Sequence, residues 1–234
     1  MICGMTVHIE FTDVSGFVSK EFYPTPAKQS LPHWYSDLKP FESIDAKKEI
    51  TQTAKRCVPI LDSFTTGYII YTPTDVEVMI NNEGRYVYRW AHKLAIEFQA
   101  LWQVGKHSGG DDRYDAIPKM PNPWGVKTPS GYSCMYIPPM NRDDAVFEIF
   151  AGVVDTDKFH QNGSMPFLLK EKDFEGVIPA GTPMAQVVPF RRESYEMSFG
   201  DDTQRVGASR QLDSMRTVFI NAYRKFMWSP KSYK

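Results

Sequence analysis

Cysteine is scarce in this chain, and its placement suggests neither a disulfide framework nor a metal site. The three cysteines, Cys3, Cys57 and Cys134, are isolated from one another, and no CxxC pair occurs. Isolated cysteines are typical of proteins from a reducing compartment, where a buried thiol needs no partner. We therefore expect free thiols.

Charge of one sign and long apolar runs are also missing. The 27 basic and 28 acidic residues give a net charge of -1, which favours neither nucleic acid nor an anionic membrane as a partner. The N-terminus lacks a basic region followed by a long apolar one, and no apolar run is long enough to span a membrane. The sequence predicts a protein that is cytoplasmic at synthesis, with no membrane and no specific nucleic-acid partner.

Known catalytic signatures are absent as well. The chain has no nucleophile elbow, phosphate-binding loop or triad pattern. His8 and Glu10 would lie on one face of a strand and could be two metal ligands, but no convincing third ligand follows. The residues themselves therefore indicate neither a metal site nor a cofactor, and they favour a protein that is not an enzyme.

Short apolar segments separated by turn residues are, by contrast, abundant. Proline fixes φ and glycine accepts a positive φ, so both residues punctuate strands. This spacing predicts a mainly β chain, folded as an antiparallel β-sandwich or jelly roll or as a β-clip-like barrel. The predicted strands are residues 5–11, 67–72, 76–80, 86–90, 91–104, 132–137, 146–152, 166–169 and 184–190.

Three stretches are predicted to connect these strands. Residues 23–41 and 114–130 are rich in proline, which cannot donate a hydrogen bond into a central ladder. We expect no regular element in the first and only a connector or an edge segment in the second. Residues 43–57 are polar and fit either a short helix that begins at Ser43 or an extended connector.

The C-terminal part changes periodicity. From Thr203 onward, apolar residues recur at spacings of three and four, and Pro230 ends the pattern. The spacing predicts an amphipathic helix over residues 206–228. This helix either covers a face or edge of the sheet or is offered to a partner subunit.

Two units follow from these patterns. Residues 1–200 form a β domain, with a core at residues 65–190 and an N-terminal arm and strand at residues 1–60. Residues 201–234 form a helix and tail that pack on this domain or on a partner.

Four segments resemble, in the same order, motifs of the β-clip enzymes, the dUTP pyrophosphatases and dCTP deaminases. The segments are Thr65-Thr-Gly-Tyr68, Pro129-Ser-Gly-Tyr132, Gly152-Val-Val-Asp-Thr-Asp157 and Ile178-Pro-Ala-Gly-Thr-Pro-Met-Ala-Gln-Val-Val188. The resemblance implies a β-clip core. It also implies that Asp155 orients the attacking water as general base in phosphoanhydride hydrolysis, and that Gln186 contacts phosphate. The further candidate ligand-binding residues are Asp157, Lys158, Tyr68 and Tyr132.

The sequence departs from this family at the residues that would hold a triphosphate. Ile69 replaces the acid that helps to bind magnesium, Pro139-Met140 replaces the Arg-Ser clamp, and Lys158 replaces a tyrosine that packs on deoxyribose. A triphosphate needs cations or hydrogen-bond donors around it. Asp155 and Asp157 therefore also fit turn residues that hydrogen-bond their own backbone.

Most of the chain resembles a family of bacterial and tailed-phage β proteins. That resemblance implies a phage-associated origin and no particular activity. It is carried by residues 57–62, 66–70, 124–133, 152–157 and 226–230.

The sequence favours a non-catalytic β-rich structural or interaction module, phage-derived and acting in the virion or its assembly. Such a module would associate with itself or with other phage proteins through sheet edges and the 206–228 helix. The alternative is a nucleotide-binding or nucleoside-triphosphate pyrophosphatase-like β-clip protein with a degenerate site, for which Mg²⁺ is the expected cofactor. A small-molecule or sugar-binding jelly roll that uses the Trp and Tyr side chains is a third hypothesis.

Overall fold

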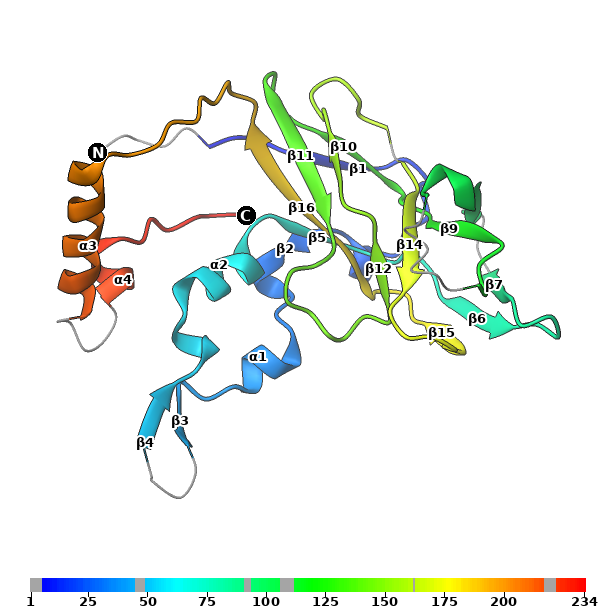
Figure 1. Cartoon of the computed structure of the whole chain (residues 1–234). Coiled ribbons are helices and arrows are strands. Elements are labelled where there is room, and N and C mark those ends of the chain that lie inside the picture. Colours follow the sequence, from blue (N-terminus) through cyan, green and yellow to red (C-terminus); the bar gives the residue numbers. More distant parts are fainter. Residues whose placement is uncertain (1–5, 45–48, 91–93, 106–111, 162, 217–221) are drawn as a thin grey trace.

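The computed structural model describes residues 6–44, 49–90, 94–105, 112–161, 163–216 and 222–234. It confirms a mainly β chain with a helical C-terminal part (Figure 1). In the described residues no helix is long and apolar enough to cross a membrane.

The strands are β1 (Glu10–Asp13), β2 (Thr25–Pro26), β3 (Phe41–Ile44), β4 (Glu49–Gln52), β5 (Tyr68–Tyr71), β6 (Val76–Ile80), β7 (Tyr86–Trp90), β8 (Glu97–Ala100), β9 (Ala116–Met120), β10 (Trp124–Lys127), β11 (Tyr132–Ile137), β12 (Phe147–Ile149), β13 (Gly152–Val154), β14 (Met165–Leu169), β15 (Gly176–Ile178) and β16 (Pro183–Arg191). The α-helices are α1 (His33–Asp37), α2 (Val58–Thr65), α3 (Asp202–Arg216) and α4 (Ala222–Phe226). Short 3₁₀ turns are η1 (Lys20–Phe22), η2 (Ala27–Gln29), η4 (Ala54–Arg56) and η5 (Leu101–Gln103).

A five-stranded sheet with the order β13-β11-β16-β5-β2 forms the centre of the fold. Strand β16 lies between β11 and β5, and both pairings are antiparallel. Met184, Ala185, Gln186 and Val187 are all buried, so both faces of this strand are covered. A four-stranded sheet (β12-β14-β9-β8) and a three-stranded sheet (β15-β6-β7) share one apolar core with it.

The β6–β7 hairpin shows how local sequence sets this architecture. Val76 and Val78 are buried and alternate with more exposed neighbours, as a one-sided strand requires. The turn closes through Asn81, whose side-chain oxygen accepts hydrogen bonds from the N–H groups of Glu83 and Arg85. Gly84 takes a φ of 76°, as the tight turn between the strands predicted at residues 76–80 and 86–90 requires.

Several predicted strand boundaries are wrong. The first strand, β1, begins only at Glu10, where its pairing with Lys127 of β10 starts. Residues 6–9 before it are not strand, and residue 5 lies outside the described part. The 146–152 segment is two strands, because the chain leaves β12 and passes at residues 150–151 into β13, which belongs to another sheet. Of residues 91–104, four form β8 and the next three form η5, while residues 91–93 lie outside the described part.

The proline-rich stretches also contain more structure than predicted. Residues 114–130 contribute β9 and β10. Pro118 is tolerated in β9 because β14 pairs only with Lys119 and Met120 of this strand. The N–H that Pro118 lacks is therefore not needed for the β9–β14 ladder. Residues 23–41 include β2 and α1. The described residues of 43–57 are neither one helix nor a plain connector, because they contribute to the paired strands β3 and β4 and then form η4.

The C-terminal helix is present but does not lie on the sheets. Asp201 caps α3, because its side chain accepts hydrogen bonds from the N–H groups of Thr203 and Gln204. Gln204 Oε1 in turn accepts the N–H of Asp201. Residues 202–214 are all exposed, and α3 stands apart from the β body (Figure 1). α3 therefore does not cover a face of a sheet, which was one of the two predicted alternatives for this helix. Residues 217–221 of the predicted helix lie outside the described part.

Candidate functional site

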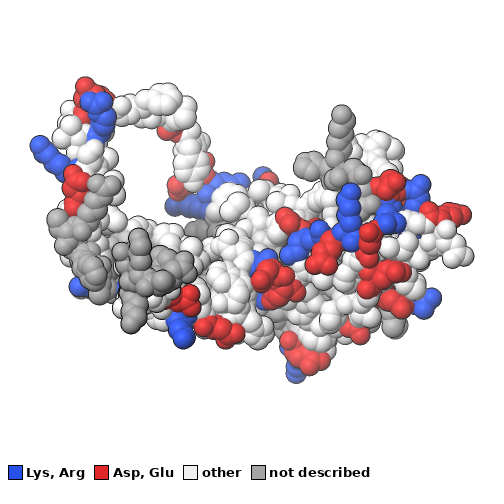
Figure 2. Space-filling view, turned by 60° about the horizontal axis from the view of Figure 1, so that its bottom comes forward, with Lys and Arg blue, Asp and Glu red and all other residues white. Residues whose placement is uncertain are grey.

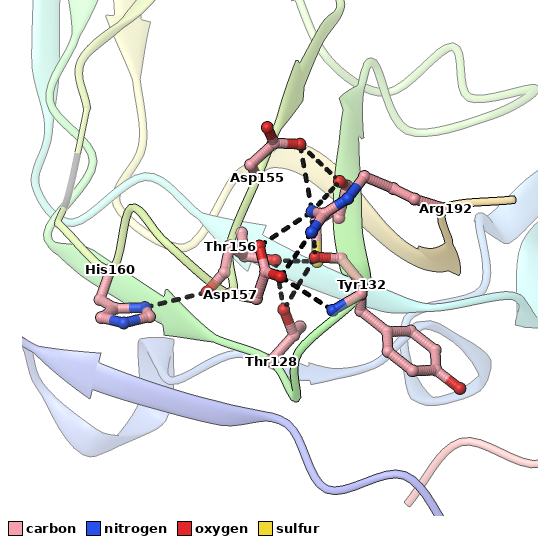
Figure 3. Close-up of polar contacts among 10 residues, drawn as sticks. Thr128, Tyr132, Asp155, Thr156, Asp157, His160 and Arg192 are labelled. Atoms are coloured by element: carbon pink, nitrogen blue, oxygen red, sulfur yellow. Dashed lines mark hydrogen bonds and ion pairs between the residues drawn. The ribbon is translucent and has the colours of Figure 1, made fainter.

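The GVVDTD segment ends at a polar cluster that joins three parts of the central sheet. Asp155 and Asp157 follow β13, Gly131 precedes β11, and Arg192 follows β16 (Figure 3). The antiparallel register brings these ends together, because Tyr132 pairs with Arg191. Gly131 takes a φ of 84°, and its carbonyl accepts a hydrogen bond from the N–H of Arg192.

Arg192 is the centre of this cluster. Its Nη1 and Nη2 atoms donate to the two carboxylate oxygens of Asp157 at 2.8 and 2.5 Å, a bidentate ion pair. Nη1 also lies 3.3 Å from Asp155 Oδ1 and 2.9 Å from both Tyr132 O and Ser133 Oγ. One nitrogen cannot bond four acceptors equally, so these contacts share its two hydrogens.

The two acids differ in exposure and in partners. The side chain of Asp157 is 5% exposed and also accepts the N–H of Gly131 at 2.8 Å. The side chain of Asp155 is 52% exposed and accepts the hydroxyl of Ser133 at 2.7 Å. Asp155 and Asp157 do lie in a turn, in which Asp155 O accepts the N–H groups of Lys158 and Phe159, but their carboxylates bond across strands and not to this turn's own backbone.

The Arg192 hydrogen bonds, followed by the Gly131 N–H, hold the pKa of Asp157 well below its ordinary value of 3.8. The pKa of Arg192 is raised in turn, chiefly by its hydrogen bond to Asp157. The low pKa keeps Asp157 ionised in the folded chain at neutral pH. Asp157 is thus a poor proton acceptor and a good structural anion.

We expect Asp157→Asn to destabilise the chain at neutral pH and to make its stability less sensitive to acid. Because the pKa of Asp157 is lower in the folded than in the unfolded state, its contribution is fully present above the unfolded-state value of about 3.8 and decreases progressively as the pH falls from there toward the lower folded-state pKa. Urea midpoints should differ most near pH 7, and the difference should shrink steadily below about pH 4. The matched control is Asp155→Asn, which removes a more exposed carboxylate from the same cluster and should cost less. A difference that stays constant over this pH range would contradict the assignment.

A buried layer supports the cluster from below. Thr156 is 1% exposed, and its hydroxyl lies 2.7 Å from the hydroxyl of Thr128 and 3.4 Å from Cys134 Sγ. The carbonyl of Thr156 is 2.9 Å from His160 Nδ1. Burial raises the pKa of the Cys134 thiol, which agrees with the predicted unreactive buried thiol.

Gln186 lies away from Asp155, inside the fold. It is 1% exposed, its Nε2 donates to Ser63 O and Thr66 O at 2.8 and 2.6 Å, and its Oε1 accepts from Met140 N at 3.0 Å. These bonds join β16 to α2 and to the loop after β11. All of the side chain's polar atoms therefore have protein partners.

The loop at residues 138–142, where the resemblance places the phosphate clamp, is also taken up by packing contacts. Asn141 donates from its side chain to Ser63 Oγ at 2.9 Å, and its carbonyl accepts the indole N–H of Trp34 at 3.0 Å. Arg142 bonds Ser30 and Asp144. The loop thus ties the N-terminal arm to the body.

Tyr68 and Tyr132 line a groove of about 800 Å³ on another side of the cluster. The Tyr132 ring points away from Asp155 (Figure 3). Tyr233, from the C-terminal tail, meets the Tyr68 ring edge-on with centroids 5.8 Å apart, and burial raises the pKa of Tyr68. The other lining residues are Thr6, Val7, His8, Ile9, Pro189, Lys231, Ser232 and Lys234.

Of the remaining predicted residues, His8 lines this groove, whereas Lys158 and Glu10 do not. Lys158 is exposed beside Asp157 and contributes to the lowering of its pKa. Among the described residues no group of three or more His, Cys, Asp and Glu side chains could hold a metal ion. Glu10 of the proposed ligand pair accepts the hydroxyl of Thr12 at 3.3 Å.

Two clusters were missed from the sequence. Arg192 could have been found, because an antiparallel pairing of residues 132–137 with 184–190 puts the start of one strand beside the end of the other. The second is at Asp62, whose carboxylate accepts Trp228 Nε1 at 3.2 and 3.1 Å and Lys231 Nζ at 2.5 Å. No local pattern signals this contact, since 166 residues separate Asp62 from Trp228.

No family model matches the chain, and no curated protein matches it significantly. Solved structures of staphylococcal phage dUTPases do match. They include a mutant dUTPase from phage phi11 of S. aureus (TM-score 0.34, 11% identity, 84% of this chain and 99% of that one). Two mutants of the Staphylococcus bacteriophage 80alpha dUTPase, each with dUpNHpp, match with TM-scores of 0.33 and 0.30 and 12% identity, over 83% and 85% of this chain and 89% and 90% of theirs.

The partial resemblance to dUTPases noted in the sequence thus recurs among the structural matches. At these identities and TM-scores, the matches carry no information about what this chain binds or does.

Proposed function

We propose that this chain is a non-catalytic β module that acts by binding other protein surfaces, as a component of a phage particle or of its assembly. The observation that carries the proposal is the C-terminal arm, residues 193–214, which projects from the body with its side chains in solvent. Figure 2 shows the arm standing off the body with open space between them. Tyr195, Met197 and Phe199 are 83, 80 and 90% exposed.

Exposed apolar side chains in this number favour an interaction surface. Single exposed hydrophobic residues are normal, whereas a cluster marks a binding site. α4 adds Phe226, which is 66% exposed. A soluble chain that keeps these groups in water gains free energy when a partner covers them.

The cluster of Asp155, Asp157 and Arg192 also supports the proposal, because it is poorly suited to catalysis. Hydrolysis of a phosphoanhydride needs a free base and cations for the phosphates. Here Arg192 is engaged by the acids themselves, and Asp155 Oδ1 already accepts two hydrogen bonds. The cluster therefore suits a clamp between strand ends better than a catalytic site.

Mass spectrometry of purified phage particles tests this function. We expect the wild-type chain to be present in the particles and Phe199→Glu to be excluded from them. Phe159→Glu, which changes an aromatic side chain that is 51% exposed outside the arm, should be retained. Absence of the wild-type chain, or equal retention of both variants, would overturn the proposal.

A second candidate, nucleotide binding, is favoured by the groove at Tyr68 and Tyr132. Its tyrosines could stack on a base, and Lys234 is a cation for phosphates, whereas Lys231 is already paired with Asp62. Mg²⁺ would accompany a triphosphate here. Calorimetric titration with each deoxynucleoside triphosphate and Mg²⁺ should give binding that Tyr68→Leu abolishes and Phe159→Leu leaves intact. The absence of a heat signal with every nucleotide would eliminate this candidate.

A further inference from the structure

The last seven residues of the chain, residues 228–234, form a tail that returns from α4 to the β body. Figure 1 shows the tail running back from α4 and ending close to α2 and β5. These residues form neither helix nor strand, and Ser229, Pro230 and Ser232 are exposed. A chain end without regular structure keeps a fixed position only where side-chain contacts tie it down.

Asp62 of α2 supplies the first of these contacts. Its side chain is 16% exposed. The two carboxylate oxygens accept the indole N–H of Trp228 at 3.2 and 3.1 Å, and Oδ2 also accepts Lys231 Nζ at 2.5 Å. One carboxylate thus bonds two tail residues, and both bonds are charge-assisted. We call this contact the Asp62 latch.

A second contact fixes the tail farther along. The ring of Tyr233 meets the ring of Tyr68 edge-on, and the hydroxyl of Tyr68 donates to Lys234 O at 3.5 Å. Tyr68 opens β5, the strand that follows α2 in the chain. The tail is therefore attached to two neighbouring parts of the same body.

The stretch between β16 and the tail is consequently held at both ends. At its start, Arg192 is paired with Asp157, and at its end, Trp228 is bonded to Asp62. Between these points, Gln211 Nε2 of α3 lies 3.0 Å from Met227 Sδ, which joins α3 to the end of α4. The chain therefore leaves the body and returns to it as a closed loop, with the open space of Figure 2 between the loop and the body.

Closing a loop at both ends restricts the conformations that it can adopt. A segment that is already restricted loses less conformational entropy when a partner binds it, so its affinity for that partner is higher. The C-terminal arm would have only its attachment at Arg192 if the tail were released. The Asp62 latch is thus placed to control how rigidly the arm is presented.

We propose that Asp62, through Trp228 and Lys231, keeps the C-terminal arm in a loop anchored at both ends, and that this anchored form is the one that a partner protein binds. The inference rests on the proposed function and adds how the arm is presented. Asp62 is a positioning residue, because it acts through the tail and does not have to touch the partner. Opening the latch leaves the exposed apolar side chains of the arm unchanged and frees only its far end.

Limited trypsin digestion, followed by mass spectrometry, tests the latch. Trypsin must bind the side chain of Lys231, which Asp62 holds in the closed tail. Cleavage of a transiently opened segment follows the population of the open form, so we expect Asp62→Leu and Trp228→Phe each to speed cleavage after Lys231 by about five- to tenfold. Adding Trp228→Phe to Asp62→Leu should give little further increase, because the acceptor of the indole is already gone.

Two controls separate this effect from general unfolding. Asp37→Leu changes an exposed carboxylate on α1 and should leave the cleavage rate after Lys231 at the wild-type value. Cleavage after Arg210, in the exposed helix α3, should be equally fast in all variants. Wild-type cleavage after Lys231 as fast as that of Asp62→Leu and Trp228→Phe would overturn the latch.

Incorporation into phage particles then tests what the latch does. We expect Asp62→Leu to be incorporated several-fold less than the wild type, and Asp37→Leu to be incorporated normally. Normal incorporation of Asp62→Leu with a released tail would overturn the inference, while the loss of Phe199→Glu from the particles would still support the proposed function. Absence of the wild-type chain from the particles would overturn both.

Discussion

Gly67→Ala is expected to unfold the protein or to lower its free energy of unfolding by about 4 kcal/mol or more. Gly67 takes a φ of 75°, a conformation that disfavours a side chain. A Cβ atom there would lie 2.2 Å from Val187 O, which is backbone of the central strand β16 and cannot move aside cheaply. Chemical denaturation followed by circular dichroism measures the loss.

Gly16→Ala is the matched control for this variant. Gly16 takes nearly the same φ, 73°, and a Cβ atom there would meet nothing within 4 Å. It should therefore cost only the backbone term of about 1–2 kcal/mol. Similar losses for the two variants would show that β16 can shift and that the close approach is not required.

The glycine of the Thr65–Tyr68 motif therefore has a structural explanation that needs no ligand. The sequence showed a Gly in a motif shared with β-clip enzymes, and this suggested a site. The structure shows that the absence of a Cβ lets β5 approach β16.

The predictable and unpredictable parts of this fold differ in the range of the interactions that decide them. The β6–β7 hairpin was predicted correctly, because its alternation and its Asn-Gly turn are local. β9 was missed as an inner strand, because Pro118 argues against one and only distant partners show where a missing N–H is tolerated. β10, which belongs to a two-stranded sheet, agrees with the edge segment that was one of the two alternatives for residues 114–130. The break between β12 and β13 was missed for the same reason as β9, since periodicity continues across it while the sheet changes.

The residues of the candidate site likewise fall into those that the local sequence identifies and those that only the strand register brings in. Asp155 and Asp157 stood out as an acidic pair after an apolar strand. Their partner Arg192 depends on the strand register, which no local pattern encodes. The exposure of α3 depends on how little apolar surface the helix has to bury, and this can be judged only once the rest of the core is known to be complete.

Gln186→Leu is expected to lower the free energy of unfolding by on the order of 4 kcal/mol. The substitution keeps the approximate volume but removes the side-chain partner of three partly buried backbone groups: Met140 N, Ser63 O and Thr66 O. Each stranded buried group costs about 1–3 kcal/mol. Urea denaturation measures the loss, and Gln103→Leu, which changes an exposed amide, should change stability far less.

Gln186→Glu separates this structural role from ligand contact. The glutamate would place a negative charge beside two carbonyl oxygens in a buried site, so its pKa should rise above the ordinary carboxyl range. Because the folded state then binds the proton more tightly than the unfolded state, the destabilisation should be greatest near neutral pH and should diminish as the pH falls through the raised folded-state pKa. That sign is opposite to the acid sensitivity conferred by Asp157. Unchanged unfolding of both Gln186 variants would mean that the amide does not hold β16 to α2, and a role in binding would then be the better explanation for it.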